Sequence, residues 1–105
     1  MAVSKIVGVT FKNGDGEDRQ VLLKTLKPKQ LLQFERDPEN EYDPTAVKVL
    51  TSEGKQLGFL PKAEAKRVAE QLDRGATIYA FVAEVTGGGK YSHGCNILYD
   101  IVAAD

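Results

Sequence analysis

Hydrophobic and polar positions follow regular spacings along most of the chain, and these spacings predict the secondary structure. Segments with alternating or continuous apolar residues, bounded by turn-forming residues, are typical of strands. The predicted strands are residues 4–11, 30–37, 46–51, 55–60, 77–85 and 96–103. The SEGK turn at 52–55 joins two of them into a hairpin, and GGGK at 87–90 is expected to be a flexible connection.

Two other segments have the apolar spacing of helices. In residues 17–28 the apolar positions follow acidic residues suited to a helix start, and Pro28 ends the segment. The second helix follows LGFLP, with Pro61 in its first turn and Gly75 as its C-terminal cap. Its apolar stripe at i, i+3, i+4 and i+7 comprises Ala65, Val68, Ala69 and Leu72.

This order of elements predicts a single α+β domain, mainly β, over residues 1–105. About five to six short strands with two helices favour a compact β-barrel whose edges or ends the helices cover. Glycines within the first predicted strand and in the last connection suit the sharp bends of barrel strands. No repeat, linker or low-complexity tail interrupts the pattern.

Charge and composition narrow the range of functions. The formal net charge is −1, from 14 Lys and Arg against 15 Asp and Glu. Proteins that follow duplex phosphates normally carry a basic excess, so any nucleic-acid binding here would depend on a local site. No apolar run approaches a membrane span, and the N-terminus lacks signal-peptide features. With one cysteine and no possible intrachain disulfide, we expect a cytoplasmic protein without a cofactor or a membrane partner.

The residues for enzyme chemistry are few. His93 and Cys95 are the single histidine and the single cysteine, two positions apart, and are expected on the same face of a strand. A Cys–His pair can form a nucleophile, but no third group is identifiable. Two such ligands do not complete a zinc site, and no phosphate-binding loop motif is present. A small hydrolase that uses this pair is therefore one hypothesis for the function, besides the two binding hypotheses given below.

An acidic turn dominates the middle of the chain, where five carboxylates fall within nine residues, 35–43. Their alternate spacing resembles a calcium-binding loop, but Tyr42 occupies the position that needs glycine and Lys48 the position that needs glutamate. The turn would otherwise be solvated, with Arg36 pairing with a neighbouring acid while Asn40 or Asp43 bonds the backbone. That interpretation leaves Tyr42 unexplained, and a tyrosine in such a place favours one wall of a binding pocket.

The sequence around this turn resembles the HIRAN domain family. The resemblance rests on RDPENEYDPTAVKV (36–49), followed by GKQLGFLPKAEAKRVA (54–69), and extends over about residues 5–103. The residues that match the family motif are Arg36, Asp37, Pro38, Asn40, Tyr42, Asp43, Ala46, Val47, Val49, Gly58, Phe59, Leu60 and Pro61. The family fold is an OB-like barrel with two helices, which agrees with the predicted elements.

The resemblance implies a non-catalytic module that binds single-stranded DNA at its 3′-hydroxyl end, in DNA repair or processing beside a helicase or nuclease. Asp43 would accept a hydrogen bond from the 3′-hydroxyl and repel a 3′-phosphate. Tyr42 and Phe11 would stack on bases, and Lys62 would hold a backbone phosphate. Asn40 would either bond a base edge or fix the turn.

The chain also departs from the family pattern. Thr10 stands where the DNA-binding members have an arginine, and the aromatic residue near the final hairpin would be Tyr91 or His93. Phe59 and Phe11 would each belong either to the core or to the DNA site, and Lys62 would either contact a phosphate or be a solvated residue at the helix start. The departures leave a second hypothesis open, in which the fold serves as a protein-interaction or structural module that has lost DNA binding.

Overall fold

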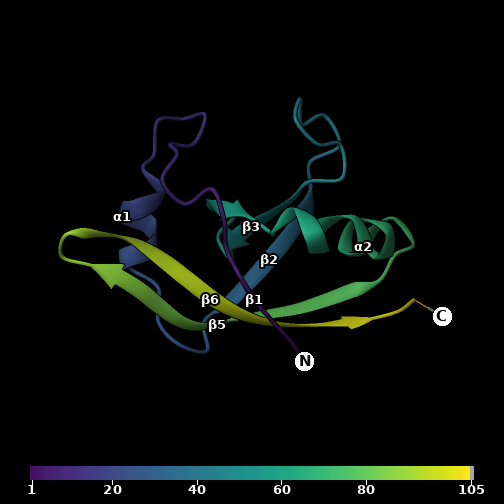
Figure 1. Ribbon diagram of the computed structural model, residues 1–105. Coiled ribbons are helices and arrows are strands. Elements are labelled where there is room, and N and C mark those ends of the chain that lie inside the picture. Colours follow the sequence, from purple (N-terminus) through teal and green to yellow (C-terminus); the bar gives the residue numbers. More distant parts are fainter. Residues whose placement is uncertain (105) are drawn as a thin grey trace.

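A computed structural model describes residues 1–104, and the structure is mainly β (Figure 1). The elements are β1 (Ala2–Lys5), α1 (Arg19–Lys24), β2 (Leu31–Arg36), β3 (Val47–Thr51), β4 (Gln56–Phe59), α2 (Lys62–Asp73), β5 (Thr77–Gly88) and β6 (Tyr91–Val102). The six strands form one antiparallel sheet in the order β1-β6-β5-β2-β3-β4. The predicted mainly β fold with two helices is therefore confirmed. Within the described chain, neither helix is long and apolar enough to cross a membrane.

The sheet is strongly curved, so that its two edge strands, β1 and β4, come close together. The residues that follow β1 join these two edges. The backbone N–H of Ile6 donates to the carbonyl of Cys95 on β6, at 3.0 Å. The next residue, Val7, pairs with Phe59 of β4 through two hydrogen bonds of 2.8 and 2.9 Å. At this crossing a Cβ on Gly58 would lie 2.3 Å from the carbonyl oxygen of Val7, so only glycine permits the approach. The result is a small, partly closed barrel of the OB-like kind.

The inward faces of the strands and one stripe of α2 form a single core. The apolar stripe predicted for α2 is confirmed, since Ala65, Val68 and Ala69 are buried. The helix ends as expected at Gly75, where the N–H groups of Gly75 and Ala76 return to Leu72 and Gln71. The largest fully buried side chains are Tyr99, Leu23, Leu57 and Ile97.

The first strand is shorter than the predicted 4–11. It ends at Lys5, and only Ile6 and Val7 continue its hydrogen bonding. Gly8 has a φ of +69°, which takes the chain out of the extended region and into a loop over residues 8–18. The loop ends at Asp18, whose carboxylate caps α1 by accepting from the N–H of Gln20.

The final hairpin is longer and more regular than predicted. Half of the glycine-rich segment expected as a flexible connection instead belongs to β5, which includes Gly87 and Gly88, so only Gly89 and Lys90 lie between β5 and β6. Gly87 and Gly88 have φ values of +77° and +105°, and the register shifts between Thr86 and Gly88. The glycines therefore form a bulge within the hairpin, because they adopt conformations that other residues avoid.

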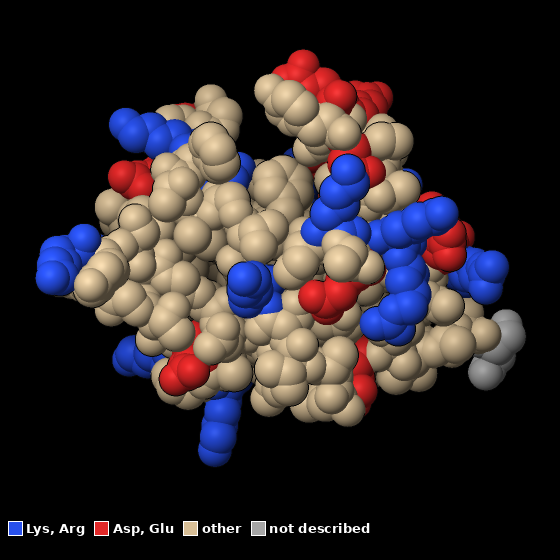
Figure 2. Space-filling view, viewed as in Figure 1, with Lys and Arg blue, Asp and Glu red and all other residues tan. Residues whose placement is uncertain are grey.

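Two loops rise from the same side of the barrel, between the end that carries α1 and the end that carries α2 (Figure 1). One is the loop 8–18 that follows β1, and the other is the acidic turn 37–46 between β2 and β3. Figure 2 shows a notch between them, with acidic side chains gathered at the tip of the second loop. This side of the barrel carries the site described below.

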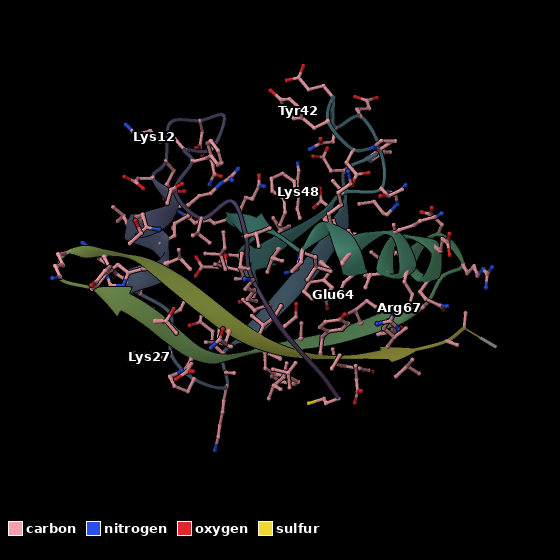
Figure 3. The ribbon with its side chains drawn as sticks, viewed as in Figure 1. Lys12, Lys27, Tyr42, Lys48, Glu64 and Arg67 are labelled. Atoms are coloured by element: carbon pink, nitrogen blue, oxygen red, sulfur yellow. The ribbon has the colours of Figure 1, made fainter. Side chains whose placement is uncertain are left out.

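Glu64 fastens α2 to the sheet and lies between the helix and the strands (Figure 3). Its two carboxylate oxygens accept from the hydroxyls of Ser4 on β1, at 2.6 Å, and Tyr99 on β6, at 2.7 Å. Tyr99 is only 1% exposed, and its burial together with the bond to Glu64 raises the pKa of Tyr99 to about 12. A single carboxylate thus satisfies the buried hydroxyl and ties three elements together.

Replacing Glu64 with alanine is expected to lower the free energy of unfolding by about 1–3 kcal/mol, because the buried hydroxyl of Tyr99 then lacks an acceptor. Urea denaturation would measure the change. Glu70→Ala, an exposed position on the same helix, is the matched control and should change stability little. Equal stabilities of the two variants would contradict this account of Glu64.

Candidate nucleic-acid interface

The acidic turn is held in shape by its own amide side chain. The Oδ1 atom of Asn40 accepts from the backbone N–H groups of Tyr42, at 2.9 Å, and Asp43, at 3.0 Å. Its Nδ2 atom donates to Asp37 at 3.0 Å. Of the two roles considered for Asn40, these bonds support the one that fixes the turn. Asn40 therefore sets the directions in which Tyr42 and Asp43 point.

Arg36 closes the base of the turn, but not in the predicted way. Its guanidinium pairs with Asp73 at the end of α2, at 3.0 Å, and not with a neighbouring acid. It also donates to the carbonyl of Pro44 at 2.9 Å. The expected pairing within the turn was wrong because an acid far along the chain lies closer in space. Arg36 consequently joins the turn to α2.

Asp43 has one carboxylate oxygen bonded and one free. Its Oδ1 atom accepts from the hydroxyl of Thr45, at 2.6 Å, and from the backbone N–H of Thr45, at 2.8 Å. These bonds, helped by the nearby charges of Lys62 and Arg36, lower the pKa of Asp43 below its ordinary value. The group is therefore a carboxylate at neutral pH. Within residues 1–104, no hydrogen bond uses its Oδ2 atom.

A hollow of about 280 Å³ lies beside this carboxylate. Its lining residues are Val7, Asn40, Tyr42, Asp43, Ala46, Phe59, Leu60, Lys62 and Ala65. Five of the predicted site residues thus meet at one place, although they come from the acidic turn, β4 and the start of α2. Tyr42 stands at the rim with 88% of its surface exposed, and Figure 3 shows it on the loop above the barrel. The mixture of aromatic faces, one carboxylate and one lysine suits a ligand with flat rings and polar groups.

Two aromatic rings, of Phe59 and Phe11, lie close to Gly8, the residue that follows Val7 of the hollow. A Cβ on Gly8 would lie 3.5 Å from the ring of Phe59 and 3.9 Å from the ring of Phe11, so both rings converge on this glycine. Phe11 is 67% exposed in the loop 8–18. The guanidinium of Arg19 lies over the ring of Phe59, 5.5 Å from its centroid. Phe59 is accordingly a wall of the hollow and is half-buried.

The comparison with known families agrees with the motif in the turn. The HIRAN domain family model matches residues 1–102. The chain belongs to the HIRAN domain family. The match covers nearly the whole chain and confirms the resemblance that rests on residues 36–49 and 54–69. HIRAN domains are known as DNA-binding modules.

Two crystal structures are similar to this HIRAN domain. A protein from Lactobacillus plantarum has a TM-score of 0.74 at 20% sequence identity, with 95% of this chain and 93% of that chain covered. The HIRAN domain of human HLTF has a TM-score of 0.69 at 23% identity, with 97% of this chain and 75% of that chain covered. A search of curated proteins finds no significant match. The two structures establish that the fold is shared.

Four residues predicted for the site of this HIRAN domain do not line the hollow: Phe11, which lies beside Gly8, and Thr10, Tyr91 and His93. Thr10 is exposed in the loop 8–18. Tyr91 lies at the tip of the final hairpin, with the amine of Lys90 5.5 Å from its ring centroid. The backbone of His93 is bonded to the side chain of Gln20, and its ring packs against Gly88. Their positions depend on the bulged hairpin and on the loop path, which local sequence does not specify.

Arg19 was not among the predicted site residues. Sequence offered no signal for it, because an arginine at the start of a helix is ordinarily exposed. The structure folds the loop 8–18 over this side chain and leaves it only 7% exposed. Its Nε atom donates to Asn13 at 2.7 Å, and its Nη1 atom donates to the carbonyl of Gly8 at 2.8 Å.

The His93–Cys95 pair is not arranged as a nucleophile. Cys95 is 2% exposed, and burial raises the pKa of its thiol to about 11. Its Sγ atom donates to the carbonyl of Asn96, and not to His93. Among the described residues, no group of three or more His, Cys, Asp or Glu side chains could hold a metal ion. Cys95 is therefore a core residue that stays protonated at neutral pH.

Native protein is expected to resist thiol reagents at pH 8, because Cys95 is buried and very little of it is in the thiolate form at this pH. Ellman's reagent should detect no rapid reaction of Cys95 in buffer and one thiol per chain in guanidinium chloride. Rapid labelling of the folded protein would contradict the buried, protonated state of Cys95.

Proposed function

We propose that this HIRAN domain is a non-catalytic module that binds single-stranded DNA at its free 3′-hydroxyl end. The support is local, because a net charge of −1 gives the chain no general attraction for phosphates. The ligand would enter the hollow between the acidic turn, β4 and the start of α2. The context would be DNA repair or processing, in which the domain works beside a helicase or nuclease.

The observation that carries the proposal is the state of Asp43. A carboxylate beside DNA normally repels it, and the low pKa of Asp43 keeps this group charged. Such a charge is useful only where the ligand presents a hydroxyl instead of a phosphate. The free oxygen of Asp43 would accept a charge-assisted hydrogen bond from a 3′-hydroxyl. The same charge would reject a 3′-phosphate, so it would select the chemical form of the end.

The other residues at the hollow suit the remaining parts of a DNA end. Tyr42 and Phe59 in the hollow, and the exposed ring of Phe11 beside Gly8, offer stacking faces for bases. Lys62 lies in the first turn of α2, beside Asp43, where an ammonium group would contact a backbone phosphate. Base-independent binding follows, since every base has a flat face to stack.

Asp43→Asn is expected to remove the preference for the hydroxyl end. The amide oxygen can still accept from Thr45, so the turn keeps its shape, but the negative charge is lost. Fluorescence anisotropy with matched 3′-hydroxyl and 3′-phosphate oligonucleotides would measure the effect. The wild type should prefer the hydroxyl end by roughly tenfold or more, and the variant should bind both ends alike.

Glu41→Gln is the matched control, because it removes one charge from the same turn at an exposed side chain. It should keep the preference of the wild type. Equal binding of both ends by the wild-type protein would overturn the proposal. No binding to any single strand at low salt would favour the alternative, a protein-interaction or structural module on the same fold.

Tyr42→Ala is expected to weaken binding of the 3′-hydroxyl oligonucleotide by about 1–3 kcal/mol, because one stacking face is lost. The ratio between the two kinds of end should stay unchanged, since Asp43 remains. Tyr79→Ala removes another exposed tyrosine, on β5 and outside the hollow, and should leave affinity at the wild-type value. The same anisotropy titrations measure both variants. Equal losses in both variants would argue against stacking at Tyr42.

A further inference from the structure

Arg19 is the one charged side chain buried in the described part of the chain. Both of its hydrogen-bond partners, the amide oxygen of Asn13 and the carbonyl of Gly8, are neutral. No ion pair joins it to a carboxylate within residues 1–104. Burial without a counter-charge lowers the pKa of Arg19, but an arginine remains protonated at neutral pH. The fold thus holds an uncompensated positive charge at this point.

The position of this charge relates it to the hollow. The guanidinium lies over the ring of Phe59, a wall of the hollow, and a Cβ on Gly8 would lie 3.6 Å from its Nη1 atom. The same point is 3.9 Å from the ring of Phe11. Arg19 therefore lies close to Gly8 together with both aromatic rings, and it contacts Phe59, which is a wall of the hollow.

One edge of the guanidinium is still available. The two bonds use Nε and Nη1, and neither uses Nη2. In residues 1–104, the only fully enclosed side-chain polar atom without a partner is Nδ1 of His93. The Nη2 group of Arg19 consequently keeps contact with solvent. A donor held in place by two bonds and aimed by a stacked ring loses little entropy when it binds an oxygen.

A buried charge is costly unless a partner of opposite sign is present. The chain supplies no such partner here, whereas a DNA strand carries a phosphate at every nucleotide. We propose that Arg19 is a DNA-contacting residue that binds a backbone phosphate of the strand whose 3′ end occupies the hollow. This inference rests on the proposed function and deepens it. Arg19 would then hold a phosphate on the Phe59 side of the hollow, in addition to the phosphate proposed for Lys62 beside Asp43.

The salt dependence of binding distinguishes a phosphate contact by Arg19 from a purely structural role in the loop 8–18. Arg19→Gln should weaken binding of a 3′-hydroxyl oligonucleotide by about tenfold or more. It should also reduce the slope of log K against log salt by about 0.7, the value for one phosphate on a single strand. Arg19→Lys should keep the slope because it keeps the charge. Lys27→Gln removes a lysine on the opposite side of the sheet (Figure 3) and should change neither quantity.

A second measurement uses the wild-type protein and does not depend on whether Arg19→Gln folds. The Nε–H of Arg19 is bonded to Asn13, so its side-chain signal should be observable in ¹H–¹⁵N spectra, assigned with Arg19→Lys. Saturation with the 3′-hydroxyl oligonucleotide should shift this signal. An oligonucleotide with methylphosphonate linkages next to its 3′ end, which lacks the charges, should produce a much smaller shift.

An unchanged slope in Arg19→Gln would overturn the inference, even where affinity falls, because Arg19 would then only support the loop. An unshifted Arg19 signal at saturation would also overturn it. In both cases the proposed function stands if the wild type still prefers the 3′-hydroxyl end. Loss of that preference in the wild type would instead reject the proposed function.

Discussion

The two hydrogen bonds between Val7 and Phe59 join the edges of the curled sheet, and the candidate site is built around them. Both residues line the hollow, and the missing side chain of Gly58 lets the two backbones meet. Immediately after this crossing the chain leaves the sheet at Gly8 and forms the loop that carries Phe11. Closure of the barrel therefore brings the loop 8–18 opposite the acidic turn and creates the notch between them.

The positions of individual charged side chains at the candidate site are more important for the proposed binding than the net charge of −1. The acids of the turn are exposed except where a specific bond uses them, and Asp43 is kept ionised by Thr45 and Lys62. Arg19, which contacts Phe59, is buried with neutral partners only. An anionic chain that ends in a hydroxyl matches this separation of signs. Under the proposed function, Asp43 would select the 3′-hydroxyl end, and Arg19 would attract the phosphates of the strand.

Periodicity and caps predicted most elements well, because apolar spacing reports which face is buried. The α2 helix begins directly after Pro61 and ends before Gly75, close to the predicted positions, and three of the strands lie within about two residues of their predicted bounds. The errors occurred at glycines. A glycine shows that the chain can leave the extended region, but not where it then goes, so the path after Gly8 and the bulge at Gly87 and Gly88 were missed.

The sequence by itself determined the acidic turn, since the bonds of Asn40 and Asp43 reach only two or three residues along the chain. Only the tertiary structure decided which residues face that turn. Phe59, Phe11 and Arg19 come together because the sheet curls and a loop folds over the first residue of α1. Such placements depend on contacts between distant segments, and no local pattern of side chains encodes them.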